Sequence, residues 1–302
     1  MLKISLAFFL LVFLNYSNAQ IKNSYIREGS LGKRITAETP EVKEAFSFVP
    51  LSKWVGERFI FLPLPKELQR YGYQNFGVDY KNYVGRIAVV TSADESGNSP
   101  QLSIKMEDNE ERIEATGVFS EDIYFYGIGL LADIDSARSK WLNKTLWYKK
   151  DQLSLYDEAN NKFENIKIKK CSPVKVVDII AGWYNDTPVR FIVQSSSGDE
   201  GFVDLNLSGT NVTSILRQNN KFNEKFFTED PRKTFQWSTK VWSAIERGKV
   251  FVGMTSEQAI LSWGKPRDIN RTNKGNIVHE KWVYASGSYL YFKNNVLKIF
   301  QK

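Results

Sequence analysis

The feature that most constrains the fold is a series of short apolar and aromatic runs between Phe46 and about Asn211. The runs are rich in Val, Ile, Phe and Tyr, and clusters of Gly, Asn, Asp and Ser separate them. This pattern is typical of β-strands, and we expect no long amphipathic helix to interrupt it. The sequence therefore predicts a β-rich region at 46–211, folded as one or two small barrels or a sandwich. The predicted strands are Arg58–Leu62, Arg86–Thr91, Leu102–Met106, Ile123–Tyr126, Lys144–Tyr148, Val174–Ile180, Val189–Gln194 and Gly201–Leu205.

One short pattern recurs in this region at offsets of 29 and 58 residues. An aromatic residue, an aliphatic residue and a turn residue precede a strand in Trp54–Ile60, Tyr83–Val89 and Trp141–Trp147. The pattern indicates either repeated barrel units or a common way of starting a strand, and we favour the second interpretation.

The C-terminal region, 236–302, contains two helix patterns. Trp237, Val241, Trp242 and Ile245 share one helical face, which predicts a helix over Trp237–Arg247. Thr255 followed three residues later by Gln258 is a capping-box pair, and it predicts a second helix that ends at Gly264.

Three strands are predicted after the second helix, at Val278–Tyr284, Tyr289–Phe292 and Val296–Phe300. Turns are expected at Ser286-Gly287 and Asn294-Asn295, because these residues tolerate the backbone of a tight hairpin. Two helices over a three-stranded antiparallel sheet are a stable two-layer arrangement. The chain as a whole is therefore predicted to be α+β.

This C-terminal region resembles the SmpA/OmlA family, the BamE-like lipoproteins of outer-membrane protein assembly. The resemblance spans about Trp237–Gln301 and is carried by four segments: Gly248–Gln258, Trp263–Pro266, Glu280–Tyr284 and Tyr289–Phe292. It implies the two-helix, three-strand fold and the binding of other envelope proteins without catalysis. A similar fold occurs in secreted proteinaceous inhibitors. The chain departs from the family in having a large β-rich region ahead of the module and no lipid-bearing Cys near its start.

A second, shorter resemblance covers residues 174–207. Two strands joined by a polar turn, then Gly198-Asp-Glu-Gly201 and a short aromatic strand, are similar to a bacterial Src-homology-three-like barrel. Such modules often bind cell-wall peptides or serve as packing units.

The N-terminal residues predict export. Lys3, an apolar run from Ile4 to Leu14, and Ser17-Asn18-Ala19 have the order of a signal peptide that is cleaved after Ala19. We expect residues 1–19 to be this signal, 20–45 a flexible leader, and 212–235 a connector between the β-rich region and the C-terminal module. The expected location is periplasmic or secreted, with no transmembrane segment.

Net charge and cysteine content limit the kinds of partner and of disulfide that the chain can have. Removing residues 1–19 lowers the net charge from +7 to +6, and basic and acidic residues are interleaved, so nucleic-acid binding is not expected. Cys171 is the single cysteine of the chain, which excludes an internal disulfide. The neighbouring Lys169 and Lys170 could lower the pKa of the Cys171 thiol and make it reactive, but we expect this thiol to be buried and inert.

Several residues have the type but not the context of a catalytic or cofactor site. His279 is the single histidine, and no nucleophile motif accompanies it. Gly127-Ile-Gly129-Leu-Leu-Ala132 matches a dinucleotide fingerprint outside any βαβ unit. Asp133 with Asp135, and the acidic pairs at 107–108 and 110–111, are weak candidates for a cation or for glycoside hydrolysis. We therefore expect no enzyme activity, cofactor or metal.

The sequence thus favours an exported, non-catalytic binding or scaffolding protein of the bacterial cell envelope. The C-terminal module would bind other envelope proteins, and we select Trp282, Tyr284, Tyr289 and Tyr291 as candidate partner-binding residues, because Tyr and Trp dominate interface hot spots. The alternatives are a cell-wall or glycan-binding protein, a secreted inhibitor, and a secreted enzyme whose carboxylates leave no motif.

Overall fold

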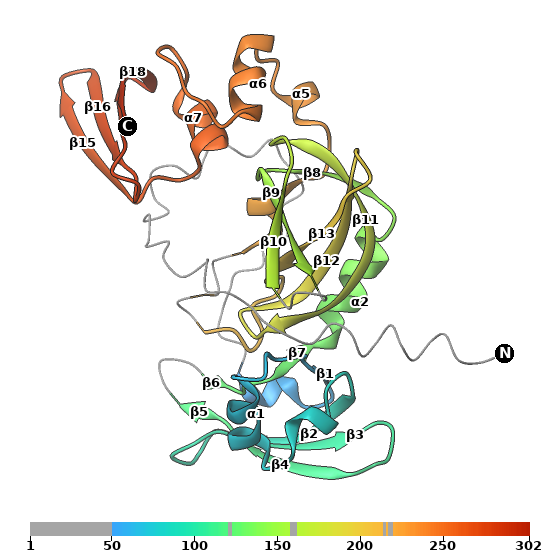
Figure 1. Ribbon diagram of the computed structural model, residues 1–302. Coiled ribbons are helices and arrows are strands. Elements are labelled where there is room, and N and C mark those ends of the chain that lie inside the picture. The colour runs from blue at the N-terminus through green and yellow to red at the C-terminus, as the bar shows by residue number, and fades with distance from the viewer. Residues whose placement is uncertain (1–49, 120–122, 158–161, 214–215, 217–219) are drawn as a thin grey trace.

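The computed structural model describes residues 50–119, 123–157, 162–213, 216 and 220–302. Three parts follow one another from bottom to top of Figure 1: an N-terminal unit, a central curled sheet and a C-terminal module. Each part has its own hydrophobic core. The fold is α+β and rich in strands, as predicted. The predicted signal peptide and leader, 1–45, lie outside the described residues.

The N-terminal unit is built on an antiparallel sheet with the strand order β4-β3-β2-β1-β7. Alternation along β1 places Phe59 and Phe61 in the core, and β2 contributes Ala88 and Val90 in the same way. Helix α1 packs against β4. The elements are η1 (Leu51–Trp54), β1 (Arg58–Phe61), α1 (Gln69–Phe76), η2 (Tyr80–Asn82), β2 (Ile87–Asp94), β3 (Gln101–Met106), β4 (Arg112–Thr116), β5 (Val118–Phe119), β6 (Ile123–Tyr124) and β7 (Ile128–Leu130).

The central part is a seven-stranded sheet with the order β10-β9-β13-β12-β11-β8-β14, in which all pairs are antiparallel. It curls like half of a barrel (Figure 1). Bulges at Val176/Asp178 and Ala181/Tyr184 interrupt the register of the long strand β11, and such bulges bend a strand. The strands are β8 (Thr145–Tyr148), β9 (Gln152–Asp157), β10 (Lys162–Lys167), β11 (Ser172–Tyr184), β12 (Thr187–Ser195), β13 (Glu200–Leu205) and β14 (Phe226–Phe227).

Helices α1 and α2 (Leu131–Trp141) both interrupt the region 46–211, and α2, with 11 residues, corrects the expectation that no long helix would do so. Helix α2 joins the N-terminal unit to the central sheet and packs against β11. Leu131, Ile134 and Ala137 are spaced by three residues, so they share the face that the helix buries.

The recurring strand-start pattern has one backbone course in all three copies. The aromatic residue is the last residue of η1 or α2, or the one directly after η2, and β1, β8 or β2 follows. The turn residue has a positive φ each time: 89° at Gly56, 76° at Gly85 and 63° at Asn143. Because β1 and β2 belong to one sheet and β8 to another, the pattern does not mark repeated barrel units. It is a common local turn between a helix and the strand that follows.

The predicted connector, 212–235, takes part in both neighbouring cores. It contains α4 (Phe222–Lys225), β14 and α5 (Pro231–Thr234). Phe226 lies in the central core and Phe227 packs on the C-terminal core. Cys171, from the central region, is itself part of the C-terminal core.

The two helices of the C-terminal module are α6 (Thr239–Glu246) and α7 (Ser256–Trp263). Ser238 caps α6, and the capping box of Thr255 and Gln258 is present at the start of α7. Gly264, with φ of 88°, ends α7 as predicted. Helix α7 lies next to the sheet, and α6 packs against α7 on the side away from the sheet (Figure 1).

The sheet of this module has four strands in the order β15-β16-β17-β18, one more than predicted. The additional strand, β15, is almost entirely polar, so its sequence carries no apolar alternation. Asn294 and Asn295 have φ of 48° and 67°, as a tight hairpin requires. The strands are β15 (Asp268–Lys274), β16 (Ile277–Val283), β17 (Tyr289–Lys293) and β18 (Val296–Gln301).

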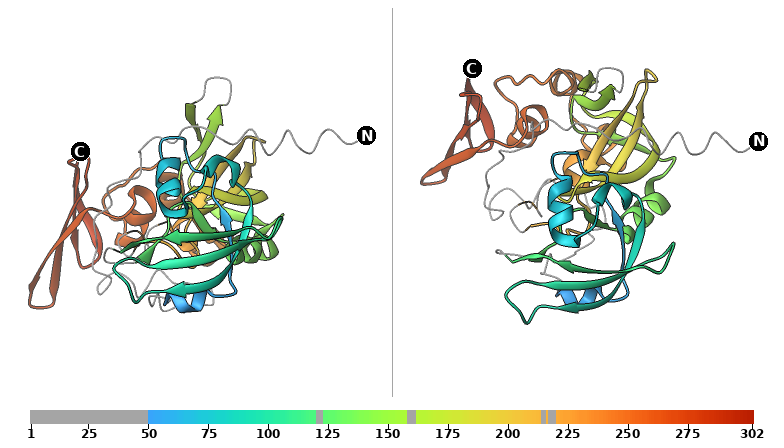
Figure 2. Two further views of the ribbon diagram at one scale, coloured as in Figure 1. Left: turned by 90° about the horizontal axis from the view of Figure 1, so that it is seen from below. Right: turned by 60° about the horizontal axis from the view of Figure 1, so that its bottom comes forward.

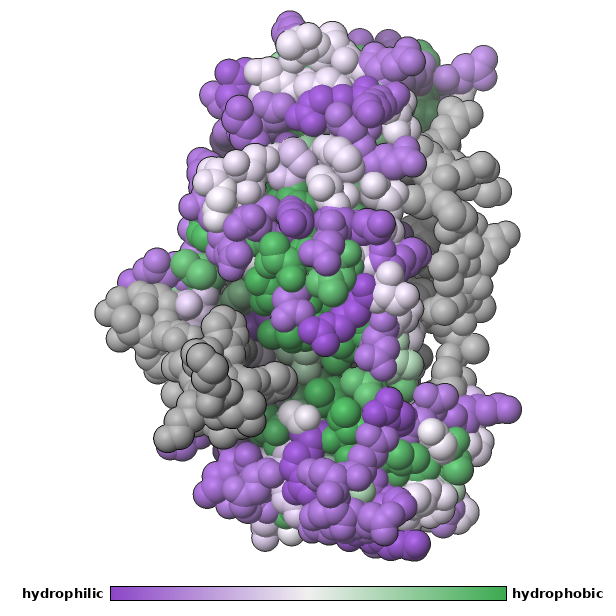
Figure 3. Space-filling model, turned by 90° about the vertical axis from the view of Figure 1, so that its right-hand side faces the viewer, coloured by the Kyte–Doolittle hydropathy of each residue, from purple (hydrophilic) through white to green (hydrophobic). Residues whose placement is uncertain are grey.

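The face seen in Figure 3 carries hydrophilic residues at both ends and an apolar area between them. Ile60 and Ala181 pack against both the N-terminal and the central core.

Among the described residues, none of the helices is both long and apolar enough to cross a membrane.

Candidate functional site

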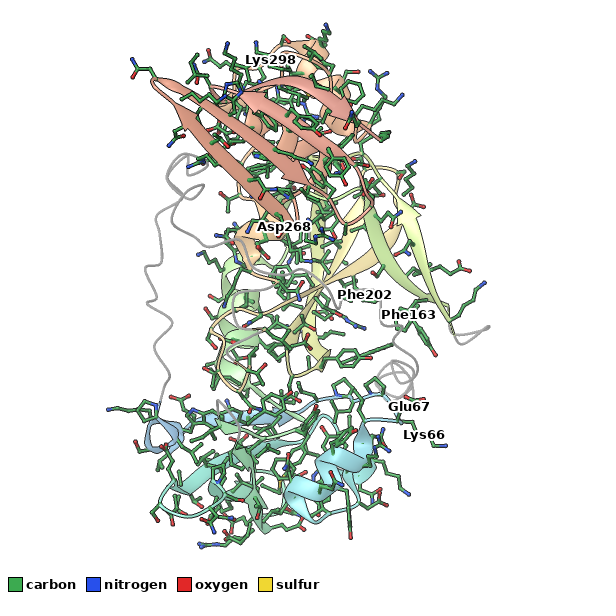
Figure 4. The ribbon with its side chains drawn as sticks, turned by 90° about the vertical axis from the view of Figure 1, so that its left-hand side faces the viewer. Lys66, Glu67, Phe163, Phe202, Asp268 and Lys298 are labelled. Atoms are coloured by element: carbon green, nitrogen blue, oxygen red, sulfur yellow. The ribbon has the colours of Figure 1, made fainter. Side chains whose placement is uncertain are left out.

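The two faces of the C-terminal sheet differ in what covers them. The inner face lies against α7, whereas the outer face points away from the body, and Figures 1 and 2 place the sheet at the edge of the molecule. Figure 4 looks onto the outer face, with Asp268 at one end of the sheet and Lys298 at the other. Because side chains alternate along a strand, the four candidate aromatic residues are divided between these faces.

Trp282 belongs to the inner face, which corrects its selection as a partner-binding residue. It is fully buried, and its ring centroid lies 4.4 Å from that of Phe292. Its Nε1–H donates to Oε2 of Glu280 at 3.1 Å, and Arg271 Nε donates to the same carboxylate at 2.7 Å. Trp282 therefore stabilises the module and is not available to a partner.

Tyr284 is also buried, so its selection as a partner-binding residue is likewise corrected. Its hydroxyl donates to the carbonyl oxygen of Gly264 at 3.2 Å, and its ring meets Trp263 edge to face. Burial raises the pKa of the Tyr284 hydroxyl well above its ordinary value. The contacts join the start of the sheet to the end of α7.

Tyr289 and Tyr291, the other two candidates, lie on the outer face. Lys281 is between them on the neighbouring strand, with its Nζ 4.6 Å from the Tyr289 ring centroid and 5.8 Å from that of Tyr291. Ile299 pairs with Tyr291 and is 55% exposed. The outer face therefore combines aromatic area, an aliphatic side chain and a cation, which is the composition of many protein-binding surfaces.

The free edge of β18 is a feature that we did not select from the sequence. Ile299 and Phe300 are consecutive, so they project to opposite faces, yet both are exposed, at 55% and 43%. Val252, next to the chain segment that touches the start of β18, is 56% exposed. The signal was the apolar run Val296-Leu-Lys-Ile-Phe300, which we interpreted as a strand only.

His279 does not gather catalytic partners. It is exposed on the outer face, and its strand neighbours are Thr272 and Lys293.

Cys171 is buried in the C-terminal core, and burial raises the pKa of its thiol to about 12. Lys170, which could have activated it, donates instead to the carbonyl oxygen of Ser262. Because the thiolate is the reactive form, this cysteine is inert in the folded protein at neutral pH.

The glycines of the dinucleotide-like motif serve packing. A Cβ on Gly127 would lie 2.4 Å from the Tyr80 hydroxyl oxygen, and one on Gly129 would lie 2.9 Å from Leu62. The N–H of Gly127 donates to Oδ1 of Asn185 at 2.8 Å. The motif therefore has no free backbone donor at Gly127 for a phosphate.

Asn185 and Asn211 bind the same short segment, Phe125–Ile128. Nδ2 of each amide donates to the carbonyl oxygens of Phe125 and Ile128, at 2.7 to 3.1 Å. Oδ1 of Asn211 accepts from the N–H of Phe125 at 2.8 Å. Both amides are buried, so this junction ties the N-terminal unit to the central part.

The acidic pairs are engaged in ion pairs on the surface of the N-terminal unit. Glu107 binds Arg58 and Asp108 binds Arg86, each at 2.7 Å, and these bonds lower the pKa of both carboxyls. A glycosidase acid needs a carboxyl pKa that is raised. The second pair is also bound: Glu110 to Lys105 and Glu111 to Tyr83.

The side chains of Asp133 and Asp135 lie in different environments. Asp133 is buried and accepts a bond from the Ser208 hydroxyl at 2.8 Å, whereas Asp135 is exposed. Within the described ranges, no group of three or more His, Cys, Asp or Glu side chains has the arrangement of a metal site.

Sequence reasoning also missed a buried ion pair in the central sheet. Arg190 makes two bonds to Asp204, at 2.7 and 2.8 Å, and both side chains are almost fully buried. The guanidinium lies between the rings of Trp183 and Phe202, at 4.2 and 3.7 Å from their centroids. In Figure 4, Phe202 lies beside Phe163, with Lys66 and Glu67 of the N-terminal unit below them.

Comparison of the chain with protein-family models, curated proteins and solved structures finds no match.

Proposed function

We propose that this protein is an exported, non-catalytic binding protein of the bacterial cell envelope that holds another protein against the outer face of its C-terminal sheet. The observation that carries the proposal is the division of the module's aromatic residues. Trp282 and Tyr284 build the core, whereas Tyr289 and Tyr291 stand on a face that the described elements leave open.

The composition of that face favours a protein as the partner. Tyrosine supplies contact area at a low cost in side-chain entropy, and the Lys281 ammonium lies over the Tyr289 ring, which orients both groups. The exposed Ile299 adds apolar area beside Tyr291. The resemblance of the C-terminal region to the SmpA/OmlA family and the export signal predicted from the sequence support an envelope location.

Site-specific photocrosslinking tests the proposal. A photoreactive phenylalanine at position 291 of the full chain, expressed in the native bacterium, should capture one envelope protein reproducibly. The matched control is position 73, because Tyr73 is 58% exposed but lies on α1 of the N-terminal unit. Equal capture from both positions, or recovery of the chain from the cytoplasm alone, would refute the proposal.

A second candidate, glycan binding, is favoured by a tyrosine cluster near α1. The rings of Tyr71 and Tyr126 are stacked at 4.9 Å, and Tyr124 meets Tyr126 edge to face at 4.9 Å. These side chains are half-buried and keep part of their surface exposed, which would suit stacking with sugar rings. Sedimentation with purified peptidoglycan, lost in Tyr71→Ala and kept in Tyr73→Ala, would establish this function.

A further inference from the structure

The two edges of the C-terminal sheet are protected very differently. An exposed strand edge offers unpaired backbone groups, and proteins usually protect it with charged or polar side chains. The edge strand β15 follows this rule, because six of its seven residues are polar and the exception is Ile269. The opposite edge strand, β18, presents Ile299 and Phe300 to solvent instead.

On its edge away from β17, β18 already forms the first hydrogen bonds of a strand ladder. The N–H of Gly253 donates to the carbonyl oxygen of Leu297 at 2.9 Å, and the N–H of Leu297 donates to the carbonyl oxygen of Met254 at 2.8 Å. Beyond Leu297, the described residues form no further ladder on this side. Residues 298–301 continue the same edge, and because the backbone groups of a strand alternate between its two sides, some of them pair with β17 and the others point to the open side.

Positive charges flank this edge. Lys298 and Lys302 lie on or next to β18, and Lys240 lies over the ring of Phe251, close to the start of the ladder. Among the described residues, no ion pair involves any of these three lysines. The side chains that surround the free backbone are therefore apolar and cationic.

We infer that the β18 edge binds an extended, acidic and apolar segment of a partner protein as a fifth antiparallel or parallel strand. This inference rests on the proposed function and names the way in which the module holds its partner. Backbone hydrogen bonds along 298–301 would supply general affinity, as in other cases of strand addition. Alternate apolar side chains of the segment would cover Ile299 and Phe300, and its carboxylates would meet Lys298 and Lys302.

A synthetic probe tests this directly. The peptide acetyl-Val-Glu-Val-Asp-Val-Glu-Val-amide, with a fluorescent label, should bind the full chain and slow hydrogen exchange at those amides of 298–301 that point away from β17. The same peptide with Lys in place of Glu and Asp should bind at least tenfold more weakly. N-methylation of alternate residues should abolish binding when the methyl groups replace the N–H groups that face β18.

Three variants separate edge binding from face binding. The variant Phe300→Lys, which leaves the outer-face residue Ile299 unchanged, should reduce binding of the acidic peptide at least tenfold, and its unchanged tryptophan fluorescence would verify folding. The double variant Tyr289→Thr/Tyr291→Thr should change peptide binding less than twofold, because these side chains lie on the outer face. Lys298→Glu/Lys302→Glu should reverse the preference between the acidic and the basic peptide.

The following results would overturn the inference: no peptide binding, equal binding of the acidic and basic peptides, or binding that tolerates every N-methylated form. Protection of the amides of 298–301 that point away from β17 without peptide, together with a dimer in sedimentation, would show that a second copy occupies the edge. Photocrosslinking at position 291 reports on the proposed function separately, since it does not depend on this peptide.

Discussion

The paired amides of Asn185 and Asn211 give a quantitative prediction about the junction between the N-terminal unit and the central part. In Asn185→Ala, the N–H of Gly127 loses its partner, whereas the carbonyl groups of Phe125 and Ile128 each keep their bond from Asn211. A buried polar group without a partner costs about 1–3 kcal/mol. We therefore expect this variant to lose about 1–3 kcal/mol of unfolding free energy.

Asn211→Gly should cost a similar amount, because it leaves the N–H of Phe125 without its acceptor. Glycine is the appropriate replacement, since Asn211 has φ of 57° and alanine would add backbone strain. In the double variant, the two carbonyl groups lose both donors. The double loss should therefore exceed the sum of the single losses by about 2 kcal/mol or more.

Urea unfolding, followed by both tryptophan fluorescence and far-UV circular dichroism, measures the three free energies. Coincidence of the two signals establishes whether a two-state analysis holds. Asn109→Ala is a control, because its side chain bonds are exposed. Single losses that add to within about 0.5 kcal/mol would refute the shared-carbonyl reasoning, because independent sites behave that way.

Three further predictions concern single residues. Cys171 should resist a thiol reagent at pH 8 in the folded protein and react at once in guanidinium, because its pKa is about 12; rapid reaction of the native chain would contradict its burial. Burial lowers the pKa of the Lys225 ammonium to about 8, so Lys225→Met should be more stable than wild type by about 3 kcal/mol at pH 7. That difference should shrink as pH rises from about 8 to 10.5, where the folded lysine is neutral while the unfolded one is still charged; a constant difference in urea unfolding would refute it. Thr255→Ala should cost about 1 kcal/mol through loss of the capping box, measured against the exposed strand control Thr272→Ala.

Local patterns predicted the C-terminal module well. The capping box, the glycine stop after α7 and the Asn-Asn turn all depend on residues that are near one another in sequence. Strand β15 was missed because hydrogen bonds to β16, and not an apolar face, define it. Helix α2 was missed because its buried apolar face consists of three residues, Leu131, Ile134 and Ala137, which is a short periodic signal.

The sorting of the four aromatic candidates shows where sequence reasoning stops. Period-two alternation places Trp282 and Tyr284 on the same face as each other, and likewise Tyr289 and Tyr291. It does not say which pair lies on the face that α7 covers. The junction amides illustrate a second limit, because Asn185 and Asn211 are 57 to 86 residues away from the groups they bind. No local signal specifies such a contact.

The participation of Cys171 and Phe227 in the C-terminal core has a consequence for modularity. A fragment starting at residue 236 would leave behind both residues, as well as Arg232, which joins the Cys171 carbonyl to Glu246. An uncovered apolar surface would remain on the excised piece and a matching one on the remainder. Grafting this module onto another scaffold would therefore require transplanting pieces from separate stretches of the chain.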